Sequence, residues 1–234
     1  MNLETMLFSQ GFGSRRQCRA LIAGGTVRVA DKVCDDPWAD WAPATDHFEV
    51  DGVAWQYRVK AYLMLHKPAG YECSRMPQHH ASVFSLLPQQ MTERGVQCVG
   101  RLDQDTTGLL LLSDDGQFVH QLASPKKHVA KAYQACLKHA LDEAQLAALR
   151  NGVLLHGDTS PSCALEAHML ASRLLALTID EGKYHQVKRM VAAAGNRVEQ
   201  LHRSAVGGLT LPPTLMPGQW QWLEPDDLLA LHSW

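Results

Sequence analysis

Two aspartates stand directly before a run of four leucines in the stretch G-R-L-D-Q-D-T-T-G-L-L-L-L, residues 100–112. An extended backbone here directs Arg101 and Asp103 to one side of the chain and Leu102 to the other. A carboxylate at the edge of a hydrophobic floor needs a cationic partner to stay ionised without a large desolvation cost. By spacing alone, Asp103 is either part of a structural ion pair, which is the commoner case, or a reactive group. Asp105 is assigned to the turn.

A cationic partner is available from a predicted helix over residues 184–194. Its apolar residues recur at spacings of three and four, and Gly195 at its end suits a helix C-cap. His185, Lys188 and Arg189 lie on the face beside that apolar stripe. This face can pair with the carboxylate, or it can be a solvated basic surface.

Three further cations, Arg15, Arg16 and Arg19, share one side of a short helix that Ser14 is placed to cap. A helix N-terminus adds backbone N–H groups and the positive end of the helix dipole, so a phosphate could bind there. On charge alone, a solvated helix face is the more common explanation. The cluster is therefore a candidate phosphate contact that needs other support.

Apolar periodicity and turn residues predict the helices and strands that must position these side chains. Helical spacing at residues 2–9 and 14–23 is followed by short strands, and the character of the sequence changes near residues 57–60. Beyond that junction, strands are expected at 61–65, 96–99, 109–112, 129–137 and 173–179, and helices at 117–123, 142–150 and 184–194. Strands outnumber helices without a regular β-α-β alternation. The sequence therefore predicts an α+β fold, with a mainly antiparallel or mixed sheet preceded by a small N-terminal α/β unit.

Composition narrows the class of protein. The 234 residues are 46% hydrophobic with a net charge of −2, which is typical of a globular protein and not of a basic nucleic-acid coat. The chain contains no run of eighteen apolar residues that would predict a membrane span, and its start lacks the basic region of a signal peptide. Six isolated cysteines without a C-x-x-C pair suit a reducing cytoplasm. The adjacent His79 and His80 lack metal-ligand spacing, so no metal site is expected.

The N-terminal pattern L-x-x-x-L-x-x-x-G-x-x-S-R-R-x-x-x-x-L-I-x-x-G-x-V-x-V, residues 3–29, resembles a small RNA-binding module first seen in ribosomal small-subunit protein four. That module presents a two-helix face to structured RNA, which implies RNA contacts for the three arginines. Members often carry a basic residue early in the first helix, where residues 2–5 are N-L-E-T, so weaker RNA binding is expected. A helix-turn-helix DNA reader is the competing interpretation, and the glycine turn with an immediate strand suits it poorly.

Residues 100–112 resemble the signature of the pseudouridine synthases that modify ribosomal RNA. Three further segments agree in the family's order: H-K-P-A-G-Y (66–71), K-A-Y (131–133) and L-T-I-D-E-G-K-Y-H-Q-V-K-R-M (177–190). With the closing segment L-H-R-S-A-V-G-G-L-T-L (201–211), the resemblance spans nearly the whole chain. The form E-G-K-Y-H-Q-V-K-R-M, with lysine where many relatives have arginine, points to the subgroup that acts on the small ribosomal subunit.

This resemblance implies a role for each candidate residue. Asp103 is the catalytic aspartate, Tyr133 stacks on the flipped uracil, and Lys188 pairs with Asp103 and keeps it charged. The target base must flip out because its reacting atoms are otherwise inside stacked RNA. Arg101 then enters the RNA where the flipped base had been. Further RNA contacts are expected from Lys67, Lys131 and Arg189, in addition to Arg15, Arg16 and Arg19. Without the resemblance, each residue has an ordinary explanation as a strand aromatic or a solvated charge.

The implied function is isomerisation of one uridine to pseudouridine in small-subunit (16S) ribosomal RNA, by base flipping and an essential aspartate. The alternatives are a large-subunit rRNA synthase and a non-catalytic RNA-binding protein of ribosome assembly. The expected domains are an RNA-binding module over residues 1–58 and a catalytic domain over 59–234. Because the reaction is redox-neutral, no metal or organic cofactor is expected. The expected partner is ribosomal RNA in a partly assembled particle, bound by a cytoplasmic monomer without membrane attachment.

Overall fold

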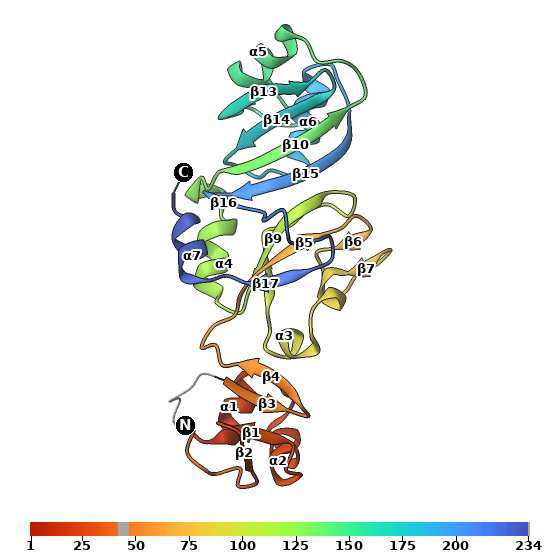
Figure 1. The fold of residues 1–234 in the computed structure, drawn as a ribbon. Helices are drawn as coiled ribbons and strands as arrows, with labels where there is room; N and C mark the ends of the chain where they lie inside the picture. The colour runs from red at the N-terminus through yellow and green to blue at the C-terminus, as the bar shows by residue number, and fades with distance from the viewer. Residues whose placement is uncertain (42–46, 234) are drawn as a thin grey trace. The chain divides into compact units, whose positions relative to one another are not determined.

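The computed structural model describes residues 1–41 and 47–233, and its internal contacts divide the chain into two units (Figure 1). The first unit combines Met1–Ala61, Leu87–Gln97 and Ser113–Asp115. The second unit combines Tyr62–Leu86, Cys98–Leu112 and Gly116–Trp234. Each unit has its own apolar core, so each is described separately.

Helices and an antiparallel sheet make up the first unit. Its elements are α1 (Leu3–Ser9), α2 (Arg15–Ala23), β1 (Val27–Val29), β2 (Lys32–Cys34), β3 (His47–Val50), β4 (Val53–Gln56) and α3 (Gln89–Glu93). The four strands have the order β2-β1-β3-β4, and a turn at Asp51-Gly52 joins β3 to β4. Ser14 caps α2 as predicted, because its hydroxyl accepts from the Gln17 N–H while the Gln17 side chain accepts from the Ser14 N–H.

The second unit contains most of the strands. Those of its large sheet are β5 (Tyr62–Lys67), β8 (Gln97–Val99), β9 (Thr107–Ser113), β10 (Lys131–Leu137), β13 (Glu166–Ala171), β14 (Leu174–Ile179), β15 (Val198–Val206), β16 (Leu209–Thr210) and β17 (Trp220–Trp222). Two short pairs are β6 (Tyr71–Glu72) with β7 (Ala81–Ser82) and β11 (Val153–Leu154) with β12 (Pro161–Ser162). The helices are α4 (Gly116–Ala123), α5 (Glu143–Asn151), α6 (Gln186–Ala193) and α7 (Pro225–Ala230), with 3-10 turns at Val83–Leu86 and Pro125–Lys127.

A nine-stranded mixed sheet is the framework of this unit (Figure 1). Its main path runs β13-β14-β10-β15-β9-β5-β17, with β8 beside β9 and β16 beside β15. The run from β13 to β15 and the β5-β17 pair are antiparallel, whereas β9 and β15 are parallel. The predicted α+β class with a mainly antiparallel or mixed sheet is confirmed. None of the described helices is long and apolar enough to cross a membrane.

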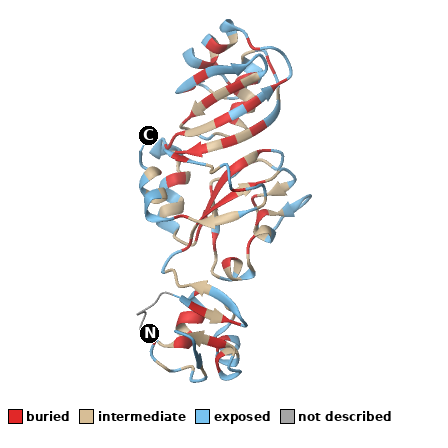
Figure 2. Cartoon of the chain, viewed as in Figure 1, coloured by how far each residue is buried: buried red, intermediate tan, exposed pale blue. Residues whose placement is uncertain are grey.

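The four leucines that follow the aspartates form the middle of β9. All of Leu109–Leu112 are buried, although successive side chains of a strand point to opposite faces (Figure 2). Both faces of β9 are therefore covered, which is typical of a strand inside a sheet. A strand held on both faces and at both edges gives the preceding loop, which carries Asp103, a rigid anchor.

Gly108 lets β9 approach β15 closely, and its replacement tests that approach. A Cβ atom at this position would lie 2.2 Å from the carbonyl oxygen of Arg203 and 2.7 Å from its nitrogen. The backbone φ of Gly108 is also +107°, a conformation that side chains with a Cβ rarely adopt. Gly108→Ala is expected to lower the free energy of unfolding by at least about 3 kcal/mol in urea titrations.

Gly70 supplies a matched control for this prediction. Its φ is +84°, but an added Cβ would meet nothing within 4 Å. Gly70→Ala is expected to cost only about 1 kcal/mol, from backbone strain alone. Equal losses of unfolding free energy in the two variants would show that the close approach to β15 is not the reason that residue 108 must be glycine.

The helix predicted from Tyr184 begins two residues later, at Gln186. His185 has φ 49° and ψ 31°, the left-handed conformation, so the right-handed helix cannot pass through it. Apolar spacing located the helix correctly, but it carries no information about this backbone turn. The consequence is that His185 belongs to the loop entering α6 and not to a helix face.

Candidate active site

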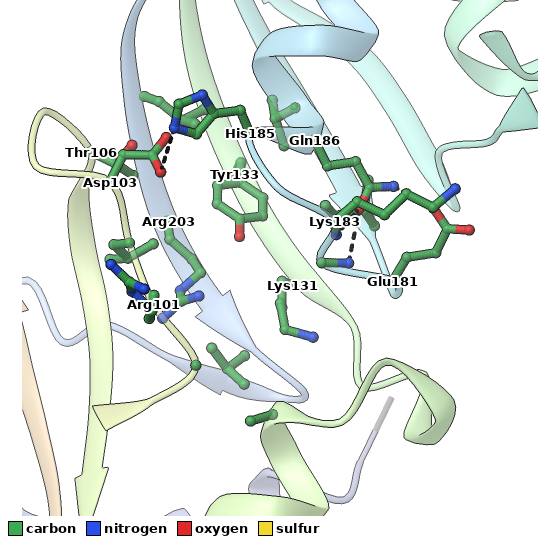
Figure 3. Close-up of a pocket in the computed structure, with 18 of the residues that line it drawn as sticks. Arg101, Asp103, Thr106, Lys131, Tyr133, Glu181, Lys183, His185, Gln186 and Arg203 are labelled. Atoms are coloured by element: carbon green, nitrogen blue, oxygen red, sulfur yellow. Dashed lines mark hydrogen bonds and ion pairs between the residues drawn. The ribbon is translucent and has the colours of Figure 1, made fainter. Parts of the chain in front are cut away.

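A pocket in the second unit gathers side chains from distant parts of the sequence (Figure 3). The loop before β9 contributes Asp103, strands β10 and β15 contribute Tyr133 and Arg203, and the start of α6 contributes His185 and Lys188. Strand pairing brings them together, because β15 lies between β10 and β9 and runs parallel to β9. The pocket therefore depends on the order of strands in the sheet.

Asp103 has a nitrogen partner at each carboxylate oxygen. The Nζ atom of Lys188 donates to Oδ2 at 3.0 Å, and Nε2 of His185 lies 3.2 Å from Oδ1, the contact drawn in Figure 3. The Asp103 side chain is 28% exposed, so it is accessible from the pocket while held in one orientation. The structure thus brings Asp103 and Lys188 together, and it adds His185, which the sequence assigned only to a basic face.

Lys188 is shared between two carboxylates. Besides Asp103, its Nζ donates to both oxygens of Asp105, at 2.7 and 3.0 Å. Burial alone would lower the pKa of Lys188, but the hydrogen bonds to Asp105 and Asp103 raise it above its ordinary value. Lys188 is therefore cationic at neutral pH. Asp105, assigned by sequence to the turn, also helps to hold this cation in place.

Tyr133 lies on β10 in the middle of the sheet, paired with Leu177 of β14 on one side and Arg203 of β15 on the other. Only 8% of the residue is exposed, and its ring faces the pocket (Figure 3). A flat aromatic face at this position can stack on a planar base. The structure places Tyr133 in the same pocket as Asp103, where the resemblance requires it.

Arg203 is a pocket residue that sequence reasoning missed. It is 3% exposed, and its Nε donates to the carbonyl oxygen of Leu109 at 2.8 Å. The remaining guanidinium nitrogens give the pocket a buried positive charge (Figure 3). The available signal was an arginine at the same parity as the apolar Leu201 and Ala205, on the side of the strand expected to face inward.

Lys131 is the second cation in the interior of the pocket. Its Nζ donates to the carbonyl oxygen of Val129 at 2.7 Å. Burial, with the nearby charge of Arg203, lowers the pKa of Lys131 to about 8. A lysine with this pKa is still mostly charged at neutral pH, so it suits the predicted contact with an RNA phosphate.

Replacing Lys131 with methionine is expected to stabilise the protein at pH 7 by about 1–3 kcal/mol, because a buried charge is removed. The folded-state pKa lies below the unfolded one, so the penalty is present below about pH 8 and disappears as the pH rises toward 10. Urea titrations at pH 7 and pH 9.5 measure it. The exposed Lys127→Met is the control, expected to change stability little at either pH. A Lys131→Met effect that is the same at both pH values would contradict the lowered pKa.

Lys67 corrects one sequence prediction. It was expected to contact RNA, but it is 0% exposed, and its Nζ donates to the carbonyl oxygens of Pro68, Gln104 and Thr106 at 3.0, 3.1 and 2.8 Å. No atom of Lys67 is exposed for RNA to contact, so that prediction is wrong. Its three donors instead tie the end of β5 to the loop that carries Asp103.

Arg101 and Arg189 occupy different environments. Arg101 is exposed at the edge of the pocket, where it can reach RNA (Figure 3). The guanidinium of Arg189 is engaged within the protein, because it donates to Oδ1 of Asp158 at 2.8 Å and to the carbonyl oxygen of His156 at 2.6 Å. These contacts do not favour the predicted contact with RNA. The contacts of Arg189 hold α6 to the segment before β12.

The arginines of α2 lie in the first unit, and two of them share one acid. Arg15 donates to Glu4 at 2.7 Å, and Arg19 pairs with the same carboxylate, which is almost completely buried. Arg16 is exposed. Because Glu4 cancels one positive charge, the face carries less charge than three arginines suggest. Weak RNA binding by this module stays a prediction.

Within residues 1–41 and 47–233, no group of three His, Cys, Asp or Glu side chains is arranged to hold a metal ion.

Comparison with known proteins gives a consistent result. The model of the RNA pseudouridylate synthase family matches residues 61–193, and that of the S4 domain matches residues 1–37. The chain is 39% identical to the ribosomal small subunit pseudouridine synthase A of Yersinia pestis, over 100% of this chain and 99% of the relative. It is 34% identical to the protein of that name from Escherichia coli (strain K12), over 99% and 100%, respectively.

Two further known proteins resemble this chain over nearly its full length. The chain is 37% identical to an RNA pseudouridine synthase of Bacillus subtilis (strain 168), YtzG, described as uncharacterized, over 100% of this chain and 99% of the relative. A crystal structure of a pseudouridylate synthase superposes with a TM-score of 0.70 at 31% identity, covering 99% of both chains. Sequence and three-dimensional similarity therefore extend across both units.

Proposed function

The chain belongs to the RNA pseudouridylate synthase family, and from that premise we propose that it converts one uridine of small-subunit ribosomal RNA to pseudouridine. Family membership makes it an RNA-modifying isomerase. The proposal of the small subunit rests on relatives that carry this substrate in their names and align with the chain from end to end.

The position of Asp103 carries the proposal. Its carboxylate lines the pocket that contains the Tyr133 ring, and it is held by Lys188 and His185 on opposite oxygens. A nucleotide whose base rests against Tyr133 would have its ribose near this carboxylate. Holding the reacting groups in such an orientation is itself a large part of catalysis.

The reaction requires that the bond between uracil N1 and ribose C1′ breaks and that C5 then bonds to C1′. The proton on C5 leaves and N1 gains a proton, so substrate and product have the same composition. Asp103 either attacks C1′ as a nucleophile or removes a ribose proton to form a glycal. Lys188 balances the charge of the carboxylate during either course.

Four pocket residues have supporting roles in this proposal. Tyr133 stacks on the uracil as it turns, Arg101 at the pocket edge fills the position left by the flipped base, and Lys131 binds a phosphate. Arg203 contributes a second buried positive charge toward the RNA backbone. Arg189 is assigned to structure, in view of its contacts with Asp158.

The N-terminal S4 domain is proposed to add RNA affinity through Arg16, with smaller contributions from Arg15 and Arg19. The substrate is proposed to be ribosomal RNA in a partly assembled small subunit, modified in the cytoplasm by a monomer. A folded particle presents RNA in one orientation, which would compensate for a weakly charged module.

Mapping of pseudouridine in ribosomal RNA tests the proposal. Cells that lack this chain should lose one small-subunit pseudouridine, and the wild-type chain supplied on a plasmid should restore it. An unchanged map would exclude the enzymatic function in these cells and favour a non-catalytic role in assembly. Loss of a large-subunit site would instead show that the enzyme class is correct and the proposed substrate is wrong.

A further inference from the structure

Tyr184 is an exposed aromatic residue beside the pocket. The residue is 78% exposed, yet its ring stacks on that of His185, with centroids 3.8 Å apart and planes inclined by 19°. Single exposed apolar residues are common on protein surfaces and need no explanation. A stacked pair is different, because one face of Tyr184 is already held against His185 while the rest of the ring faces solvent.

The ring beneath Tyr184 is fixed from two directions. The Nε2 atom of His185 contacts Asp103 at 3.2 Å, and the His185 backbone has φ 49°. This conformation is unfavourable for a residue other than glycine, and such strain persists where surrounding contacts require it. The side-chain oxygen of Gln186, which accepts from the N–H groups of Gly182 and Lys183, holds the turn from the other side. The stacked pair is therefore held in place before any ligand arrives.

The surroundings of the pair favour a nucleotide over an apolar ligand. Tyr184 and His185 line an open cleft whose charged residues are Arg101, Lys183, Lys188, Glu72, Asp103 and Asp105. Lys188 pairs with Asp103 and Asp105, and Lys183 pairs with Asp158 and Glu181. The exposed Arg101 is therefore the cation best placed to meet a phosphate. An aromatic face next to cationic side chains fits a base that stacks while its phosphate meets positive charge. Arg189 also holds the backbone at Tyr184 in place, since its Nη1 donates to the carbonyl oxygen of Tyr184 at 3.4 Å.

We propose that Tyr184 and His185 form a stacking platform for an unpaired base of the substrate RNA that neighbours the flipped uridine. This inference rests on the proposed function, because it places the flanking nucleotide at the rim of the pocket where Asp103 acts. The platform is a binding feature separate from Tyr133, which faces the pocket itself. Because His185 contacts Asp103, a base stacked on Tyr184 is connected through His185 to the proposed catalytic carboxylate.

Variants of Tyr184 separate stacking from general apolar contact. Tyr184→Leu keeps an apolar side chain but removes the aromatic face, whereas Tyr184→Phe keeps the face and removes only the hydroxyl. The probe is a small-subunit rRNA fragment that contains the mapped site, assembled with small-subunit ribosomal proteins as in the proposed substrate. Tyr184→Leu is expected to weaken binding of this fragment about 5- to 100-fold, as expected for one base–aromatic stack, and Tyr184→Phe should bind within about twofold of the wild type. Because Tyr184 is exposed, both variants should unfold at the wild-type urea concentration.

An abasic substitution in the RNA provides the matched measurement. Removing the base of each nucleotide beside the target in turn should weaken wild-type binding at one position and leave Tyr184→Leu binding unchanged there. Wild-type modification of the fragment is measured first, so a failure of the proposed function is seen as absent product. If the wild type is active but Tyr184→Leu binds as tightly, or if the abasic losses are the same in both proteins, the platform is overturned.

Discussion

Replacing Asp103 with asparagine is expected to abolish pseudouridine formation while the protein stays folded. The substitution keeps the size of the side chain, and asparagine can still accept a hydrogen bond from Lys188 through its single oxygen. The substitution removes the negative charge that is proposed either to attack the ribose or to take its proton. Loss of the proposed reactive group is expected to lower turnover by at least about 1,000-fold.

Release of tritium from carbon 5 of labelled uridine in RNA measures this loss, since that hydrogen leaves in the reaction. Asp105→Asn is the matched control, because it makes the same chemical change two residues away on a carboxylate that shares Lys188. It is expected to reduce turnover by less than about tenfold. Comparable losses in the two variants would mean that Asp103 has no special role, and turnover in Asp103→Asn would exclude it as the reactive group.

Lys188→Met is expected to have the second largest effect, a loss of turnover of about 100-fold or more. The lysine is the cation between Asp103 and Asp105, and without it two carboxylates face each other across the pocket edge. Burial raises the pKa of Asp105, but the hydrogen bond and charge of Lys188 more than offset this and hold it below its ordinary value. Without Lys188 the pKa of Asp105 should rise, and an NMR titration of the Asp105 carboxyl group measures that change.

Lys188→Arg distinguishes a charge effect from a loss of packing. Arginine restores the positive charge, so this variant is expected to regain most of the turnover and the lowered pKa of Asp105. The Lys188 pKa is raised in the folded state, so its stabilising contribution is complete at neutral pH and is lost only as the pH rises above about 10.4. Both variants should therefore be compared at pH 6–9. A methionine variant with unchanged turnover across that range would exclude the proposed role of Lys188.

Short-range features of the sequence determined much of the fold. The Ser14 cap depends on residues three positions apart, and the Asp51-Gly52 turn on two neighbours. The run of four leucines predicts a buried strand, β9, and the apolar spacing predicts a helix with one buried face, α6. These features could be predicted because backbone propensity and periodicity act within one segment. The family signature added the order of the motifs and the candidate roles of Asp103, Tyr133 and Lys188.

The fate of individual charges was decided only by the tertiary structure. Lys67 looked like an RNA contact, yet the packing of β5 beside the Asp103 loop buries it among three carbonyl groups. Arg203 enters the pocket because β15 pairs with β10 on one edge and β9 on the other. His185 reaches Asp103 because its left-handed turn takes it out of the helix. A linear pattern cannot specify these outcomes, because the partner of each charge comes from a strand or loop that is distant in the chain.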